Sequence, residues 1–322
     1  MTSKDKCTIG VDLGGHFIKL AVVDGTGKIQ LRETAPTYAD KGKDASIAQI
    51  VRSVKAFVAK AKAVCDAPIG VGIGAPGLIH VETGIVRFSP NLPGWSEVPL
   101  RQILEDATGL PVGLGNDANV VAMAENAFGA GRDFQDFVCA TLGTGIGGAI
   151  VIGGKVVTGA DGTAGEIGHI TVDPNGPRCN CGNRGCLERF VGIKYMVERA
   201  VSKIEHRTSE SILPKMVDGH LEDLTPKIIA QAAEQGDRLA REVFDETGAY
   251  LGIAFASLVN VLNPEAIVLG GGVSNAGELI FRPIRETIRR RAMPVPRATV
   301  QIIRATLGPD AGIIGASLLV RQ

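Results

Sequence analysis

Two segments of this chain look like copies of one structural unit, and this repetition constrains the fold more than any other feature. Residues 9–24 (IGVDLGGHFIKLAVVD) and 139–152 (CATLGTGIGGAIVI) each join two apolar runs through a glycine turn. Such runs around a glycine turn are typical of β-hairpins. Each copy continues into a second turn, a lysine and an apolar strand, at 27–29 and 154–156. We therefore predict a duplicated, two-lobed α/β fold, and we expect the cleft between the lobes to hold the ligand.

The length of the chain and its balance of charges limit the fold and the partners that can be expected. A chain of 322 residues is long for one compact core, which agrees with two lobes. Its 34 basic residues offset its 34 acidic residues, so no net field attracts nucleic acid or an anionic membrane. The polar N-terminus runs into a strand pattern without an apolar signal-type stretch, and no apolar run is long enough to span a bilayer. We expect a cytoplasmic protein that binds neither nucleic acid nor membrane.

Apolar residues at helical spacing predict helices between and after the repeated units. A helix from Ile47 to Ala61 would begin after Ser46 as its N-cap, and a short helix from Leu100 to Ala107 would end at Gly109. Another runs from Ala118 to Phe128. In the second half we predict helices over 225–235, 237–261, 277–292 and 311–319, with strands over 266–269 and 299–303.

The letters G-x-G-x-x-G occur twice, at Gly72 to Gly77 and at Gly143 to Gly148. A dinucleotide-binding motif must open a helix whose N-terminus receives the pyrophosphate. Pro76 interrupts the first pattern, and a strand pattern over 149–152 follows the second. The chain also lacks the phosphate-loop pattern G-x-x-x-x-G-K-[ST]. We therefore expect neither of these two nucleotide-binding designs.

Three glycine turns at strand ends instead indicate a nucleotide site. They are Gly14-Gly15 after Asp12, the turn at 143–145, and the glycines at 270–272 after an apolar strand. Glycine lets backbone N–H groups approach phosphate oxygens closely. Each turn alone could equally be an ordinary hairpin turn. Their occurrence together favours the nucleotide site.

The segment 168–188 contains three thiols and an imidazole within eighteen residues, which is the donor set of a tetrahedral structural zinc site. A cytosolic location disfavours disulfides here, and the alternative is a loop that binds nothing. Four protein ligands leave no open position for water, so the metal would be structural. The other cysteines, Cys7, Cys65 and Cys139, are interpreted as small buried hydrophobic residues. The predicted ligands are His169, Cys179, Cys181 and Cys186.

These motifs together resemble the ROK family (repressors, uncharacterised reading frames and sugar kinases) of the actin-like ATPase superfamily. The resemblance covers nearly the whole chain and is strongest over 165–188, while 89–95 (SPNLPGW) is similar to bacterial glucokinases. It implies an actin-like, ribonuclease H-like fold with a zinc-stabilised loop, use of ATP with Mg²⁺, and a homodimer or higher homo-oligomer. We expect a smaller lobe of residues 1–117 plus 304–322 and a larger lobe of 118–303.

The resemblance also implies a role for individual residues. Asp117 would be the catalytic base. The sequence departs from the family at His16, where threonine is usual. The sugar would be bound by Asn91, Asn116, Asp117, Glu166, His169 and Glu188; the ATP phosphates would meet Asp12, Gly14, Gly15, His16, Thr144 and Gly145; and Gly271 and Gly272 would approach the adenosine.

The residue types suit this chemistry. Phosphoryl transfer needs positioning and a base, and a carboxylate at a strand-to-helix corner, Asp117, can supply the base. Taken alone, Asp117 is more readily interpreted as an N-cap for the helix at Ala118, and only the whole pattern favours the base. Glu166 and Glu188 flank the metal ligands, so an ordered loop would fix both carboxylates, although solvated surface charge is the alternative. His169 could bind zinc through one nitrogen and a sugar hydroxyl through the other.

We therefore expect an ATP-dependent hexose kinase that converts glucose and ATP to glucose 6-phosphate and ADP. An N-acetylhexosamine substrate (N-acetylmannosamine or N-acetylglucosamine) and a different phosphoryl donor stay open. A catalytically silent ROK sugar sensor also stays open because of His16. A repressor is disfavoured, because the first strand begins by Ile9 and leaves no room for a preceding helix-turn-helix.

Overall fold

The computed structural model describes residues 7–206 and 210–321, which form two compact units, each assembled from separate stretches of the chain. The first unit contains the residues up to 135 together with 149–165 and those from 305 onward. Its elements are β1 (Thr8–Leu13), β2 (Phe17–Val23), β3 (Ile29–Pro36), α1 (Lys43–Ala61), β4 (Val71–Ala75), β5 (Leu78–His80), β6 (Ile85–Phe88), β7 (Ser96–Val98), α2 (Leu100–Thr108), β8 (Val112–Asn116), α3 (Asp117–Phe128), β11 (Lys155–Val156) and α11 (Ala311–Leu318).

The second unit contains residues 136–148 and 166–304. The chain passes from it into the first unit within β10. Its elements are β9 (Phe137–Leu142), β10 (Ile146–Ile152), α4 (Glu188–Val191), α5 (Ile193–His206), α6 (Leu213–Met216), α7 (Pro226–Glu234), α8 (Arg238–Leu262), β12 (Ala266–Gly270), α9 (Glu278–Arg291), α10 (Pro294–Thr299) and β13 (Gln301–Arg304).

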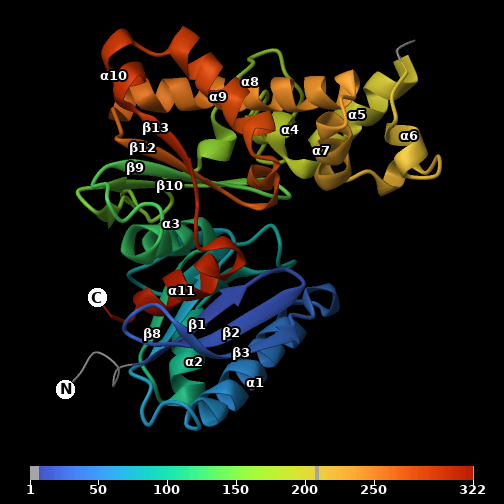
Figure 1. The fold of residues 1–322 in the computed structure, drawn as a ribbon. Coiled ribbons are helices and arrows are strands. Elements are labelled where there is room, and N and C mark those ends of the chain that lie inside the picture. Colours follow the sequence, from blue (N-terminus) through green and yellow to red (C-terminus); the bar gives the residue numbers. More distant parts are fainter. Residues whose placement is uncertain (1–6, 207–209, 322) are drawn as a thin grey trace. The chain divides into compact units, whose positions relative to one another are not determined.

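The two large sheets repeat one topology (Figure 1). The first has the order β3-β2-β1-β4-β8, and the second has the order β11-β10-β9-β12-β13. In the first sheet β1 pairs antiparallel with β2 and parallel with β4, which in turn is parallel to β8. In the second, β12 is parallel to both β9 and β13. This equivalence confirms the predicted duplicated α/β architecture.

Alternation along β1 separates two faces of the first sheet. Ile9, Val11 and Leu13 are buried in one apolar cluster with α1 and α2. The opposite face carries Gly10, where a Cβ atom would overlap the carbonyl oxygen of Ile313 in α11. A Cβ atom on Gly72 of β4 would likewise overlap the carbonyl oxygen of Ala316. These glycines let α11 lie directly on the sheet, backbone against backbone.

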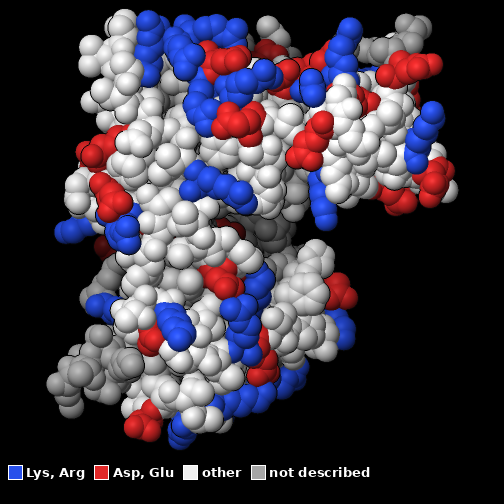
Figure 2. Space-filling view, in the orientation of Figure 1, with Lys and Arg blue, Asp and Glu red and all other residues white. Residues whose placement is uncertain are grey.

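The second sheet is covered by helices that pack on it through apolar side chains. The long helix α8 and its neighbour α9 share an apolar core with β9 and β12 (Figure 1). Within residues 7–206 and 210–321, no helix has both the length and the apolar character needed to cross a bilayer. On the face drawn in Figure 2, acidic and basic side chains are interspersed over both units.

Several predicted helix ends are confirmed. Helix α2 ends at Gly109, whose φ of 70° is left-handed. Helix α7 begins after Thr225, whose hydroxyl accepts a hydrogen bond from Ile228 N, and α8 begins after the capping residue Asp237. Four helices of the described residues, α4, α5, α6 and α10, were not predicted.

The predicted N-cap of α1 is wrong. The helix begins at Lys43 with Gly42 as its cap, so Ser46 lies inside it and is buried. The Ser46 hydroxyl donates to the Lys43 carbonyl at 2.7 Å and accepts from Trp95 Nε1 at 2.9 Å. Its role is therefore to anchor the buried indole of Trp95.

The interpretation of Cys7 and Cys65 as separate hydrophobic residues is also wrong. The two form a disulfide with Cα atoms 6.4 Å apart, joining the residue before β1 to the turn after α1. Their separation of 58 residues along the chain gave no local sign of this pairing. Cys139 is buried in β9 as predicted.

The buried carboxylate of Glu125 in α3 ties down two segments of the first unit. It accepts hydrogen bonds from Ala130 N at 2.7 Å, Thr306 N at 3.1 Å and Leu307 N at 2.9 Å. Ala130 lies just before the chain leaves this unit, and Thr306 lies just after it returns. One side chain of α3 therefore holds the segment near the chain's first exit from this unit and the segment at its last return.

We expect Glu125→Gln to lower the free energy of unfolding of the first unit by about 3 kcal/mol, because the amide directs an N–H group at backbone donors and leaves buried partners unsatisfied. Urea unfolding followed by the fluorescence of Trp95, the single tryptophan, reports on this unit. Glu286→Gln, at an exposed position of α9, is the control. Equal unfolding midpoints for both variants would contradict the assignment.

Candidate active site and metal centre

Asn116 is the N-cap of α3, and Asp117 is the first residue inside the helix. The Asn116 side-chain oxygen accepts from Ala118 N at 2.9 Å and Asn119 N at 3.2 Å. Asp117 is the first helical residue, and its Oδ1 accepts from Ala118 N at 2.9 Å. A carboxylate in the first turn interacts favourably with the helix N-terminus. The interpretation of Asp117 as the cap is therefore wrong, since Asn116 has that role.

Asn116 also connects α3 to the loop that carries Asn91. Its Nδ2 donates to the carbonyl of Gly77 at 3.1 Å, and Gly77 packs against the backbone of Ser89. The loop from Ser89 is fixed at its far end by Trp95, which is 2% exposed. Asn91 itself is exposed.

The first predicted phosphate turn lies against the same loop. A Cβ atom on Gly15 would lie 2.9 Å from the carbonyl oxygen of Asn91. Asp12, at the end of β1, pairs with Lys19 at 3.0 Å. The first unit thus brings together Asn91, the turn 14–16, and Asn116 next to Asp117. The His16 side chain is exposed.

In the second unit the four predicted metal ligands converge. One ligand atom from each of them lies within 4.8 Å of all the others. The sulfur atoms of Cys181 and Cys186 are 3.6 Å apart, and His169 Nδ1 is 3.8 Å from Cys179 Sγ. Two thiolates bound to one tetrahedral zinc ion lie about 3.8 Å apart. The donor set and its spacing fit such an ion.

The loop backbone holds this spacing. Cys179 N donates to the Asn183 carbonyl at 2.8 Å, and Leu187 N donates to that of Ile170 at 2.9 Å. Gly185 has a φ of 65°, and a Cβ atom there would overlap the carbonyl oxygen of Asp173. No other residue can therefore replace Gly185 without strain.

Electrostatics also favour a bound cation. Burial raises the pKa of Cys186 to about 12, and the neighbouring thiols add to this effect. The backbone donor of Asn183 lowers the pKa of Cys181. Crowded thiols do not all ionise unless a cation compensates their charges. The cluster can therefore hold a soft divalent metal.

The carboxylates beside the metal ligands form a second group. His169 Nε2 lies 3.9 Å from Glu166 Oε2, on the side of the ring away from Cys179. Burial raises the pKa of Glu166; His169 opposes the shift, whereas the charge of Glu188 adds to it. The structure thus brings Glu166, His169 and Glu188 together.

Glu188 also reaches a predicted phosphate turn. Its Oε2 accepts from Ile146 N at 3.4 Å and lies against Gly145, where any side chain would overlap it. Thr144 is exposed at the tip of this turn. The turn at Gly271 packs against the backbone of Leu142, the last residue of β9. The sequence carried no signal for the contact between Glu188 and Gly145.

Comparison with known proteins decides the family. Residues 8–322 match the model of the ROK family. This chain belongs to the ROK family. The predicted family and its actin-like α/β fold are thereby confirmed.

Glucokinases are among the most similar relatives of this ROK protein. The glucokinase of Thermotoga maritima is 41% identical, over 98% of this chain and 97% of its own. The structure of a ROK family glucokinase from Streptomyces griseus in complex with glucose and AMPPNP has a TM-score of 0.84 and 39% identity, over 98% of this chain and 99% of that one. The xylose repressor of Caldicellulosiruptor bescii is 33% identical, over 97% of this chain and 77% of its own.

We expect purified protein to carry about one tightly bound divalent metal ion per chain, because the four donors complete one tetrahedral shell. Cys181→Ala should lose most of this metal, which elemental analysis by mass spectrometry measures directly. Cys139→Ala, which changes a buried cysteine outside the cluster, should keep it. Equal metal content in the two variants would exclude the cluster as the binding site.

Proposed function

We propose that this ROK protein is an ATP-dependent hexose kinase that phosphorylates glucose to glucose 6-phosphate. The position of Asp117 carries the proposal: its carboxylate stands at the head of α3 while Asn116 caps the helix. The glucokinase relatives, at 41% and 39% identity over nearly the full chain, support the same activity.

In the proposed mechanism, the oxygen of the sugar 6-hydroxyl attacks the γ-phosphorus of ATP, and Asp117 accepts the proton of that hydroxyl. The bond from the γ-phosphorus to the bridging oxygen breaks, and ADP leaves. Such transfer depends mainly on positioning and charge stabilisation, with the base taking the hydroxyl proton. Carboxylate and amide groups bind sugar hydroxyls at fixed angles. We assign this binding to Asn91, Asn116, Glu166, His169 and Glu188.

ATP would enter as its magnesium complex. We assign its phosphates to the turn that follows Asp12, including Gly14, Gly15 and His16, and to Thr144 and Gly145. Backbone N–H groups at such turns suit phosphate oxygens. Gly271 and Gly272 would approach the adenosine.

The metal we propose is a structural Zn²⁺ ion. His169 would bind it through Nδ1, the nitrogen that faces Cys179, so that Nε2 stays directed toward Glu166 and the sugar. All four ligands come from the protein, so the ion would fix the loop and take no part in transfer. A cytoplasmic location and a homodimer or higher homo-oligomer remain predictions.

A sugar sensor without kinase activity is the second candidate. The 33% identity to a xylose repressor over 97% of this chain favours it, as does His16 in the phosphate turn. Binding without turnover would identify such a sensor. An N-acetylhexosamine kinase would keep the mechanism and change only the substrate.

We expect Asp117→Asn to lower kcat by about 10²- to 10⁴-fold, because the amide cannot accept the hydroxyl proton. Coupled ATP turnover should be measured on glucose, mannose, fructose, N-acetylglucosamine and N-acetylmannosamine. Because asparagine is isosteric with aspartate, the affinity for the sugar and the thermal midpoint should stay close to those of the wild type.

Each outcome of this assay separates the candidates. Turnover on glucose that is lost in Asp117→Asn supports the glucokinase. Turnover on N-acetylglucosamine or N-acetylmannosamine would identify an N-acetylhexosamine kinase with the same mechanism. Full activity of the variant would refute Asp117 as the base. Sugar binding without turnover on any sugar would refute the kinase.

A further inference from the structure

Helix α4, which begins with Glu188, is a single turn of four residues. One helical turn is not stable alone in water, because nucleation costs more than its few hydrogen bonds return. Its first residue lies two positions after Cys186, a predicted metal ligand. Its end leaves backbone carbonyls without helical partners. The position of the Glu188 carboxylate therefore depends on what holds both ends.

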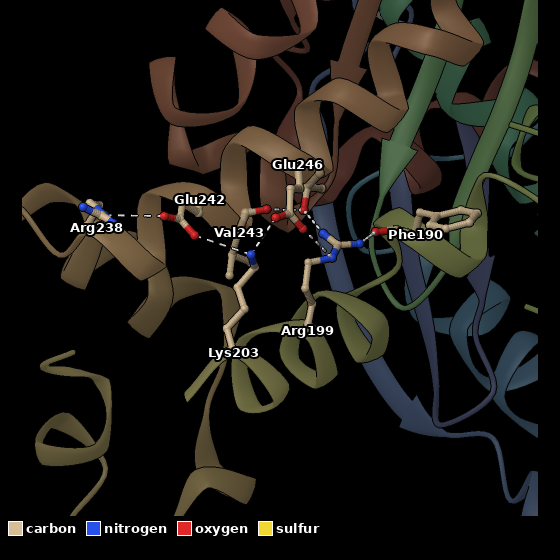
Figure 3. A network of polar contacts seen from close by, with 8 residues as sticks. Phe190, Arg199, Lys203, Arg238, Glu242, Val243 and Glu246 are labelled. Carbon is tan, nitrogen blue, oxygen red and sulfur yellow. Dashed lines mark hydrogen bonds and ion pairs between the residues drawn. The ribbon is translucent and has the colours of Figure 1, made fainter. Parts of the chain in front are cut away.

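Arg199 of α5 holds the far end (Figure 3). Its Nη2 donates to the carbonyl of Phe190, in the last half-turn of α4. Its Nη1 donates to Thr247 Oγ1 on α8 at 2.9 Å, and its Nε lies 3.4 Å from Glu246 Oε2. One guanidinium group thus connects α4 to α8.

The aromatic ring of Phe190 strengthens this connection. It stacks on Tyr250 of α8 with ring centroids 4.1 Å apart. The Cζ atom of the same ring lies next to Gly176 of the metal loop: a Cβ atom on Gly176 would be 2.9 Å from Cζ. Phe190 is therefore fixed by its ring between α8 and the metal loop and by its carbonyl to Arg199.

The burial of Arg199 makes these contacts strong. Only 16% of its side chain is exposed, and burial lowers its pKa. A buried guanidinium needs several acceptors, and removing it leaves those acceptors unsatisfied. A planar guanidinium can also serve three acceptors at fixed angles, which an ammonium group cannot.

We propose that Arg199 is a positioning residue for sugar binding: by holding the carbonyl end of α4, it sets the place of the Glu188 carboxylate that binds the sugar. This inference rests on the proposed role of Glu188 in the kinase. Arg199 itself touches no substrate. A bound metal would fix the segment that leads into α4, and Arg199 fixes its end.

Lys203 is a matched control on the same helix (Figure 3). Its side chain is 12% exposed, which is close to the value for Arg199. In the described structure it pairs with Glu242 at 3.5 Å and Glu246 at 2.6 Å, both on α8. It joins α5 to α8 without reaching α4. Loss of either cation should cost stability, but only loss of Arg199 should move Glu188.

The experiment compares Arg199→Met, Lys203→Met and Arg199→Lys in the zinc-loaded full chain. We expect Arg199→Met to raise the KM and Kd for glucose about tenfold or more, with the zinc content unchanged. Lys203→Met should leave the glucose constants near those of the wild type. Arg199→Lys should fall between them and preserves the test if the methionine variant does not fold.

Hydrogen exchange of the amides from 187 to 192 gives a readout that needs no ligand. We expect faster exchange there in Arg199→Met than in Lys203→Met. Equal exchange and equal glucose constants in the two variants would overturn the proposal, as would loss of zinc from Arg199→Met, which would place the effect in the metal loop. If the wild type turns over no sugar, the proposed kinase fails, while the exchange comparison still decides the role of Arg199.

Discussion

The close contact between α11 and the first sheet is the constraint on which the rest of the first unit depends. The strands face the helix with glycine at Gly10 and Gly72, so the helix carbonyls of Ile313 and Ala316 rest on strand backbone. Helix α11 in turn touches α3 just as closely, because Gly315 meets the carbonyl of Val120. Interiors packed at this density transmit small displacements. The place of Asp117 at the head of α3 is therefore set by backbone contacts that no side-chain rearrangement can relax.

The second unit positions its polar groups by a different means. Glu166 and His169 lie at a single 3-10 turn, and Glu188 begins the single turn of α4. Segments this short do not fix a side chain on their own. The proposed zinc ion would supply the missing constraint at one end of α4, and the buried charge of Arg199 supplies it at the other. Cross-linking by a metal limits the conformations of a loop without requiring a large apolar core. Packing thus fixes α3, whereas the proposed metal coordination and the buried charge of Arg199 would fix the carboxylates.

Features set by residues close together in the chain could be predicted from the sequence, whereas features set by contacts between distant residues could not. The hairpins, α2, α7, α8 and the four metal ligands each follow from residues close together in the chain. Ser46 was misassigned because its partner is Trp95, forty-nine residues away. Gly72 of β4 lies directly against α11, and this contact depends on a helix near the other end of the chain. Asp117 was placed at the right junction, and only the structure shows that Asn116 is the cap.

The backbone around His16 bears on the choice between kinase and sensor. Gly14 N donates to the carbonyl of Phe17 at 2.9 Å, and Thr37 N donates to that of His16 at 2.9 Å. The Thr37 hydroxyl donates to the carbonyl of Gly14 at 2.7 Å. The turn is therefore held by main-chain groups and Thr37, and the exposed imidazole takes no part in its geometry. Replacing the usual threonine by His16 changes the group presented to a phosphate but not the backbone donors. The backbone geometry that the proposed kinase needs of this turn therefore does not depend on the side chain at position 16.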